Sequence, residues 1–147
     1  GVSQAMAAAG ITTGMRFQPA TFSIPGGYEA GLSLLADPRS RPTAIVAGCD
    51  EIAIGVIVAA RQLGIQIPSQ LSVIGIDGHD LAEMFALTTL EQFPSQQGTR
   101  AVELVMERMA DDADSPARAI TMPVHLTVRR STTAPPPEMP VSAAPAR

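Results

Sequence analysis

Polar side chains directly follow three apolar runs of this sequence, at Cys49-Asp50, at Asp77 and at Gln92. If the runs are parallel strands, their ends meet at one edge of a sheet, which is where open α/β folds bind ligands. A carboxylate accepts hydrogen bonds from hydroxyl groups, and an amide both donates and accepts. Such a set suits a small neutral polyol such as a sugar, with an aromatic side chain covering the apolar face of the ring. We expect Asp77 to make the strongest contact, because a hydrogen bond to a charged group contributes about 1.5–3 kcal/mol.

These residues, and the two histidines, also have simpler structural interpretations. Asp50 is most simply the cap of a following helix, and Asp77 fits a cap as well as it fits a ligand contact. Cys49 is more typical of a buried small residue than of a nucleophile, since no base lies near it in the sequence. His79 and His125 are an isolated loop residue and an isolated strand residue, so they predict no metal site. The sequence has no glycine loop for phosphate, nucleophile elbow or carboxylate pair, and we therefore expect neither a cofactor nor an enzyme.

The elements that must position these side chains alternate between strand and helix. The three apolar runs, residues 43–48, 71–76 and 87–91, are typical of buried strands. Periodicity predicts helices at 2–9, 28–35, 51–63, 81–85 and 97–109, a strand-like stretch at 14–18 and a half-exposed strand at 124–128. This order predicts an α/β fold with a doubly wound parallel sheet and three α/β/α layers. The helix at 51–63 is apolar nearly all round, so it needs a second partner besides the sheet.

The composition is that of a single folded unit. The 147 residues are 46% hydrophobic and 16% charged, as in an ordinary globular domain. Residues 131–147 are rich in Pro and Ala, so we expect a disordered tail after a folded unit of residues 1–130. The ten basic residues are all arginines, mostly scattered, in a chain of net charge −4, so this segment by itself offers no basic patch for DNA. The single cysteine excludes an intramolecular disulfide and fits a reducing compartment. No apolar run approaches the roughly 20 residues of a membrane span.

Five segments of the chain together resemble one family. They are RPTAIVAGCDEIAIG (41–55), ARQLGIQIP (60–68), LSVIGID (71–77), LTT (87–89) and VRRST (128–132). In combination they look like the lactose/galactose repressor (LacI/GalR) family of bacterial transcription regulators. The resemblance implies a two-lobed effector-binding core of the type I periplasmic-binding-protein kind, joined to an N-terminal helix-turn-helix that we expect to be absent from this chain. Residues 1–130 then correspond mainly to the C-terminal lobe, with residues 93–121 belonging to the N-terminal lobe.

The resemblance also assigns ligand contacts. Phe22 falls where family members place an aromatic ring against the effector, Asp77 falls on the family's effector-binding Asp, and Gln92 falls near a hinge position that reaches the ligand. Cys49 stands where the family usually has an Asn, and a thiol does not replace the hydrogen bonds of an amide. We expect the effector to be a sugar or a related polyol.

The same resemblance implies a homodimer whose interface uses the helical stretch at 52–61 and the segment at 81–85. The implied interface residues are Ile54, Ile57, Val58, Arg61, Leu81, Met84 and Phe85. A dimer partner would then cover the second face of the apolar helix. The expected function is the effector-sensing and dimerisation portion of a cytoplasmic transcriptional repressor that reaches operator DNA only through the missing domain.

A periplasmic sugar-binding protein of an ABC transporter is the alternative function. It shares the two-lobed fold and has Asp-Gly at the place of Asp77-Gly78. The segments at 63–73, 87–89 and 129–132 look like the repressor branch instead.

Overall fold

A computed structural model describes residues 1–11, 14–110 and 118–135 of the chain. Its elements are α1 (Val2–Ala8), α2 (Ile24–Leu35), β1 (Ala44–Val46), α3 (Asp50–Gln62), β2 (Ser72–Asp77), the 3-10 helix η1 (Asp80–Ala82), β3 (Thr88–Glu91), α4 (Pro94–Ala110) and β4 (His125–Thr127). This alternation confirms the α/β fold class. The stretch at 14–18, predicted as strand-like, is irregular coil, and the helix predicted at 81–85 is reduced to the single 3-10 turn of η1.

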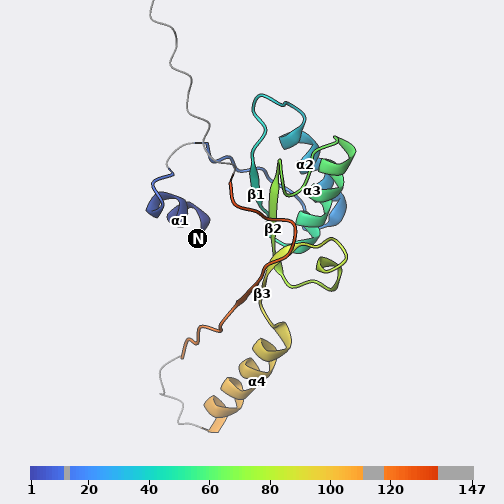
Figure 1. Cartoon of the computed structure of the whole chain (residues 1–147). Helices are drawn as coiled ribbons and strands as arrows, with labels where there is room; N and C mark the ends of the chain where they lie inside the picture. Colours follow the sequence, from blue (N-terminus) through green and yellow to red (C-terminus); the bar gives the residue numbers. More distant parts are fainter. Residues whose placement is uncertain (12–13, 111–117, 136–147) are drawn as a thin grey trace, which may run out of the picture.

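The described strands form one sheet in the order β1-β2-β3-β4. Strands β1, β2 and β3 are parallel, with Val46 opposite Ile74 and Gly75 opposite Thr89. Strand β4 runs antiparallel to β3, so the predicted parallel sheet carries one antiparallel edge strand. The chain leaves β3 through α4 beyond the end of the sheet and comes back from that side, so β4 must run in the opposite direction (Figure 1). The parallel part of the sheet brings the carboxyl ends of β2 and β3 to the same edge.

Helices α2 and α3 form one layer against the sheet, and their backbones touch (Figure 1). A Cβ added to Gly55 would lie 2.2 Å from the Ile24 carbonyl oxygen, and one added to Gly27 would lie 2.3 Å from the Ile52 carbonyl oxygen. Only glycine allows this approach. A second partner of the apolar helix is therefore α2 of the same chain. Ile54 and Ile57, which we expected at a dimer interface, are 0% and 2% exposed in the core of this chain.

The opposite face of the sheet is open at β1. Val46 is 51% exposed, and Ala44 on the same face is exposed as well, so the run at 43–48 is not buried on both faces as predicted. Ile45 points the other way and packs against the core. Helix α1 lies across from this open face (Figure 1), and none of its residues is buried. The layer of α2 and α3 therefore accounts for most of the core.

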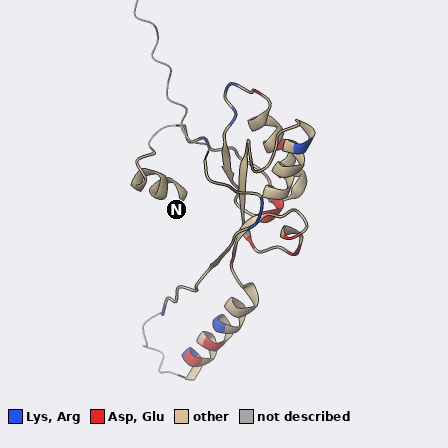
Figure 2. Ribbon diagram, in the orientation of Figure 1, with Lys and Arg blue, Asp and Glu red and all other residues tan. Residues whose placement is uncertain are grey.

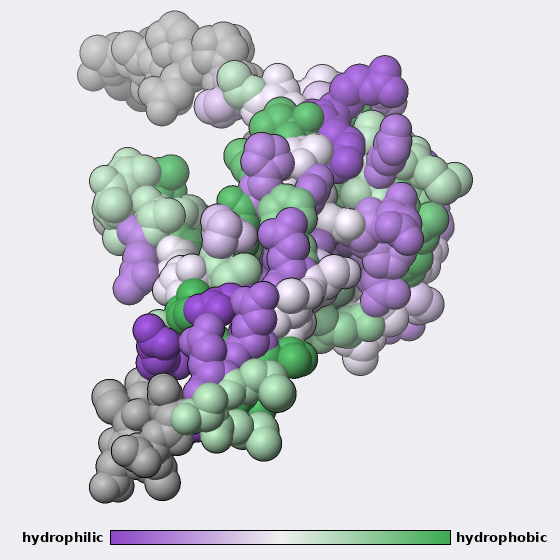
Figure 3. Space-filling view, turned by 90° about the horizontal axis from the view of Figure 1, so that it is seen from below, coloured by the Kyte–Doolittle hydropathy of each residue, from purple (hydrophilic) through white to green (hydrophobic). Residues whose placement is uncertain are grey.

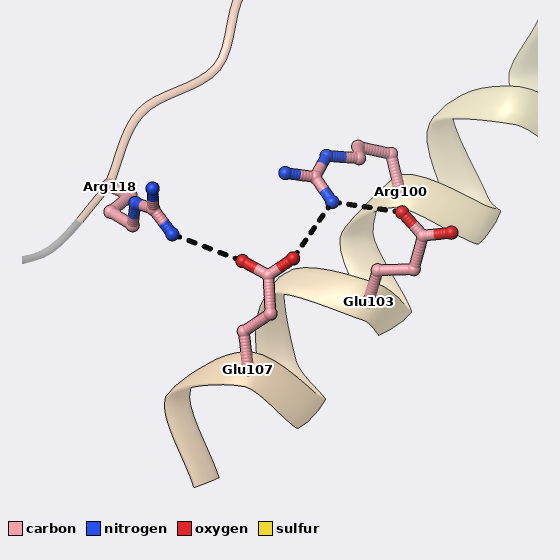
Figure 4. A network of polar contacts seen from close by, with 4 residues as sticks. All are labelled: Arg100, Glu103, Glu107 and Arg118. Atoms are coloured by element: carbon pink, nitrogen blue, oxygen red, sulfur yellow. Dashed lines mark hydrogen bonds and ion pairs between the residues drawn. The ribbon is translucent and has the colours of Figure 1, made fainter. Parts of the chain in front are cut away.

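Helix α4 projects from the sheet and has no buried residue (Figure 1). The amphipathic pattern predicted for 97–109 is present, and its apolar side chains Val102, Val105 and Met109 are exposed. On the charged side, Arg100 Nη1 lies 2.9 Å from Glu103 and 3.1 Å from Glu107, and Arg118 also contacts Glu107 (Figure 4). These pairs are exposed and contribute little to stability. Viewed from below, where α4 projects, polar and apolar residues are interspersed (Figure 3).

The segment after β4 is fastened to the sheet. Ser131 is buried between β2 and β3, where its Oγ accepts the Thr88 N–H (2.8 Å) and donates to the Val73 carbonyl (2.6 Å). Val73 N–H in turn donates to the Ser131 carbonyl at 2.8 Å. Thr133 reaches Ser72 in the same way. Ser131 to Thr133 therefore belong to the folded unit and not to the expected tail, whose residues 136–147 lie outside the described part of the chain.

Candidate functional site

Asp77 and Gln92, both predicted to bind a ligand, meet at the carboxyl ends of β2 and β3. Gln92 Nε2 donates a hydrogen bond to Asp77 Oδ1 at 3.0 Å. Gln92 is itself held by Gln97, whose Nε2 donates to the Gln92 carbonyl at 2.6 Å. Asp77 is exposed and Gln92 is half-buried, so the pair presents both a carboxylate and an amide at the surface. This is a donor and acceptor set that can engage neighbouring hydroxyl groups of a polyol.

The Asp77 carboxyl has a raised pKa. Partial burial is the main cause, and the nearby negative charge of Asp50 adds to it. The group nevertheless remains at the surface, where a ligand hydroxyl can reach it. Binding that needs the ionised carboxylate is therefore sensitive to acidic pH over a range that begins higher than for an ordinary Asp.

Asp50 is not the helix cap that the sequence indicates. The N-cap of α3 is Cys49, and Asp50 is the first helical residue. Its side chain is fully buried and makes long-range contacts: Oδ1 accepts the Thr89 hydroxyl at 2.6 Å and Oδ2 accepts the His79 N–H at 2.8 Å. The carboxylate ties the start of α3 to β3 and to the turn after β2. Its negative charge is also favourable at the first turn of a helix.

Cys49 follows β1, and the Phe22 ring lies beside the same end of this strand. Cys49 is buried, and its side chain makes no capping hydrogen bond. Phe22 is 74% exposed, and its ring tip lies 3.8 Å from the position of a Cβ on Gly48. A partner or ligand at this edge of the sheet can therefore contact the Phe22 ring, whereas Cys49 is covered by its own chain.

A cavity of about 460 Å³ lies beside β1, and most of its lining is apolar. It is bordered by β1, by residues of α1, α2 and α3 and by the coil at 14–18. Phe22 and Gly48 line it, but Asp77 and Gln92 do not. Asp77 and Gln92 therefore lie outside the apolar cavity, at the ends of β2 and β3 in the sheet that begins with β1.

Two residues of this region, Thr89 and His79, have structural roles that the sequence does not predict. Thr89 sits in a β-strand as one of two adjacent threonines, and nothing in the pattern shows that its hydroxyl meets Asp50. His79 acts locally, because its Nδ1 accepts the Leu81 N–H at 3.0 Å and caps η1. The only sequence feature that could have indicated a buried partner for Thr89 is the pair Thr88-Thr89 inside an otherwise apolar strand.

The described residues were also compared with the patterns of a metal site, a basic patch and a membrane span. Within them no three His, Cys, Asp or Glu side chains are grouped as metal ligands. The basic residues of the described part are distributed over separate elements (Figure 2). None of the described helices has both the length and the apolarity needed to cross a bilayer.

Known proteins share this sequence and fold. Residues 1–132 match the family described as a periplasmic binding protein-like domain. The chain is similar to a protein of Photobacterium profundum named HTH-type transcriptional repressor PurR, with 36% identity over 134 residues, covering 89% of this chain and 40% of the relative. A protein of the same name from Pectobacterium atrosepticum is 37% identical over 112 residues, covering 75% of this chain and 32% of the relative.

Solved structures agree. A LacI transcriptional regulator from a Rhodococcus species superposes with a TM-score of 0.78 at 27% identity, covering 88% of this chain and 47% of that structure. The chain belongs to the LacI family as a periplasmic binding protein-like domain. A LacI-family regulator from Enterococcus faecium with bound ribose resembles this LacI-family domain with a TM-score of 0.76 at 28% identity, covering 88% of this chain and 48% of that structure. The domain thus spans less than half the length of these structures and about a third of the curated relatives.

Proposed function

We propose that this LacI-family domain is the effector-sensing and dimerisation portion of a cytoplasmic transcriptional repressor, and that its effector is a sugar or related polyol. The observation that carries the proposal is the Gln92 to Asp77 hydrogen bond of 3.0 Å, which joins a carboxylate and an amide at the exposed ends of two parallel strands. That edge is the usual ligand position of an open α/β sheet.

Two ribose-bound relatives support a sugar as the effector. One is the Enterococcus faecium regulator, and the other is a LacI-family regulator from Enterococcus faecalis that is 35% identical, with a TM-score of 0.68 over 77% of this chain and 42% of that structure. In the proposed site, Asp77 accepts ligand hydroxyls, Gln92 donates and accepts, and Phe22 stacks on the sugar ring. Cys49 is the weakest of the expected contacts, because its thiol is buried. The named curated relatives are repressors, which favours this function over a transporter component.

The proposed mechanism is a shift between two arrangements of the whole protein. An effector that binds one arrangement more tightly increases its population, and the difference in affinity sets the size of the response. Operator DNA is contacted by a part of the protein outside this chain. No chemical step is required, so no cofactor or catalytic group enters the scheme.

The proposed homodimer uses the expected interface residues that remain at the surface. Val58, Arg61 and Met84 are exposed, and Leu81 and Phe85 are half-buried. The Arg61 guanidinium carbon lies 5.4 Å above the Phe85 ring, so an apolar and a cationic group already pack together there. Ile54 and Ile57 are buried in the core of this chain, so they do not contribute interface contacts of their own.

Isothermal titration of the full protein with a panel of sugars and nucleosides, ribose included, tests the effector. Asp77→Ala is expected to weaken sugar binding by about tenfold or more, since a charged hydrogen bond is worth about 1.5–3 kcal/mol. Asp80→Ala, the same change at an exposed carboxylate three residues along, is the matched control and is expected to leave the affinity unchanged. The affinity of the parent protein should also fall on acidification, because the raised pKa of Asp77 brings its protonation to higher pH.

Three results would contradict this proposal. If no sugar or nucleoside binds, the protein is not an effector sensor of the proposed kind. If only nucleosides bind tightly, the protein is an effector sensor but its effector is not a sugar. If the Asp77 and Asp80 variants lose equal affinity, Asp77 is not a specific contact of the effector.

A further inference from the structure

The turn after β2 is held by a buried polar pair, Asp50 and Thr89. The Asp50 carboxylate is fully buried, and each of its oxygens has one partner: the Thr89 hydroxyl at 2.6 Å and the His79 N–H at 2.8 Å. The Thr89 Oγ1 also accepts the Gly78 N–H at 3.3 Å. The two residues that follow Asp77 therefore both donate their backbone N–H to this pair, Gly78 to Thr89 and His79 to Asp50.

The Asp50 carboxylate fits against β2 because Gly75 of that strand has no side chain. A Cβ on Gly75 would lie 2.0 Å from Asp50 Oδ1, so any other residue at this position would displace the carboxylate. Burial of a carboxylate is costly unless it is hydrogen-bonded. An apolar residue would fill this space without that cost, so the retained carboxylate points to a need for its two hydrogen bonds.

That need lies in the backbone of Asp77. Asp77 has a φ of +120°, a conformation that side-chain-bearing residues rarely adopt. Such conformations persist only where the surrounding structure holds them. The Asp77 side chain is exposed, so packing over it does not supply this constraint. The pairing of Asp77 with Glu91 holds its backbone on the strand side, and the hydrogen bonds from the Gly78 and His79 amides hold it on the turn side.

We propose that Asp50 and Thr89 are positioning residues of the effector site: they fix the turn at 77–79 so that the Asp77 carboxylate stays at the exposed edge within hydrogen-bond reach of Gln92. This inference rests on the proposed function, since it assumes that Asp77 contacts the effector. Neither Asp50 nor Thr89 needs to touch the ligand. Both act through the backbone that follows Asp77.

Two adjacent threonines allow a matched test in the full protein. Thr89→Val removes the hydroxyl that links Asp50 to Gly78, whereas Thr89→Ser keeps it. Thr88→Val is the control, because Thr88 is equally buried (2% against 0% exposed) but its Oγ1 bonds to Arg129 and Thr132, away from the turn. Both valine variants lose buried hydrogen bonds and are expected to lose similar stability. Asp50→Ala is the harsher variant and leaves two donors without an acceptor, so the threonine variants carry the test.

The first measurement needs no ligand. Native-state hydrogen exchange of the Gly78 and His79 amides is expected to be at least about tenfold faster in Thr89→Val than in the parent, which corresponds to about 1.4 kcal/mol. Thr89→Ser and Thr88→Val should keep the parent rates at these two amides. Unchanged exchange in Thr89→Val, or equal acceleration in Thr88→Val, overturns the positioning role.

The second measurement is ribose titration at neutral pH. Thr89→Val is expected to bind ribose about tenfold more weakly, Thr89→Ser to recover most of the affinity, and Thr88→Val to match the parent. Parent-like affinity in Thr89→Val overturns the inference even if exchange is faster. If the parent binds no ribose and no other member of the sugar and nucleoside panel, the proposed function fails on its own, and hydrogen exchange still decides whether the pair holds the turn.

Discussion

The contact between α2 and α3 makes a sharp prediction for Gly55→Ala. A Cβ at this position would lie 2.2 Å from the Ile24 carbonyl oxygen and 2.4 Å from the Tyr28 backbone nitrogen. Ordinary contact begins at 3.4 Å, so the new methyl group is at least 1.0 Å too close to two backbone atoms. Backbone atoms of a helix do not rotate away as the end of a flexible side chain does. The two helices must therefore move apart.

The expected size of the effect follows from two opposing terms. Overpacking of a core costs about 1–3 kcal/mol, and close contact with backbone atoms of α2, which cannot rotate away, places this site at the upper end. Alanine is a better helix former than glycine by about 1 kcal/mol, which offsets part of the cost. The net expectation is a loss of about 2 kcal/mol in the free energy of unfolding. At a urea m-value of about 2 kcal/mol/M, the unfolding midpoint falls by about 1 M.

Urea unfolding followed by far-UV circular dichroism measures this loss. Gly98→Ala is the matched control, because Gly98 lies within α4 and a Cβ there would meet nothing within 4 Å. Its midpoint should be unchanged or higher, since only the helix-forming term remains. A Gly55→Ala midpoint at or above that of the parent would refute the close-packing argument. An equal fall in Gly98→Ala would show that glycine itself, and not the α2 to α3 contact, is responsible.

Two further predictions follow from the C-terminal anchor and from the exposed surface. Ser131→Ala leaves the Thr88 N–H and the Val73 carbonyl without their buried partner, so the free energy of unfolding in denaturant should fall by about 1–3 kcal/mol. Ser72→Ala changes a less buried serine bonded to the same segment and should cost less than about 0.5 kcal/mol, and equal losses in the two variants would contradict the anchoring role. Met84→Glu puts a charge on a side chain that is 78% exposed in the single chain, so it should shift the full protein toward monomer in sedimentation velocity without lowering its stability. An unchanged dimer would show that this surface is not part of the interface.

The proposed site depends on residues that the sequence identifies only in part. Asp77 and Gln92 follow apolar runs, and their hydrogen bond confirms that the two strand ends meet. Thr89 belongs to β3, the strand that Gln92 follows, but it is polar inside the core, where its partner comes from the distant helix α3. No periodicity relates Asp50 to Thr89, since 39 residues separate them. Long-range side-chain pairs of this kind can be read only from a structure.

The sequence by itself determined the local elements, because those follow from short-range physics. Apolar runs became β1, β2 and β3, and helical periodicity gave α4, whereas α2 begins at Ile24, four residues before the predicted start. It also determined the family, through segments spread along the chain. Only the tertiary structure decided which of these elements pack against one another. The glycines of α2 and α3 let two backbones touch, so the apolar helix finds its second partner within the chain.

The same distinction applies to polarity and to strand direction. Asp50 has the position of a capping residue, but its burial between α3 and β3 makes its carboxylate a link between segments. Ser131 lies in a stretch that reads as a tail, but its hydroxyl fills a gap between two strands. Strand β4 runs antiparallel because of where α4 leaves the sheet. Burial, partner and direction are properties of the assembled fold, since each depends on residues that are far apart in the sequence.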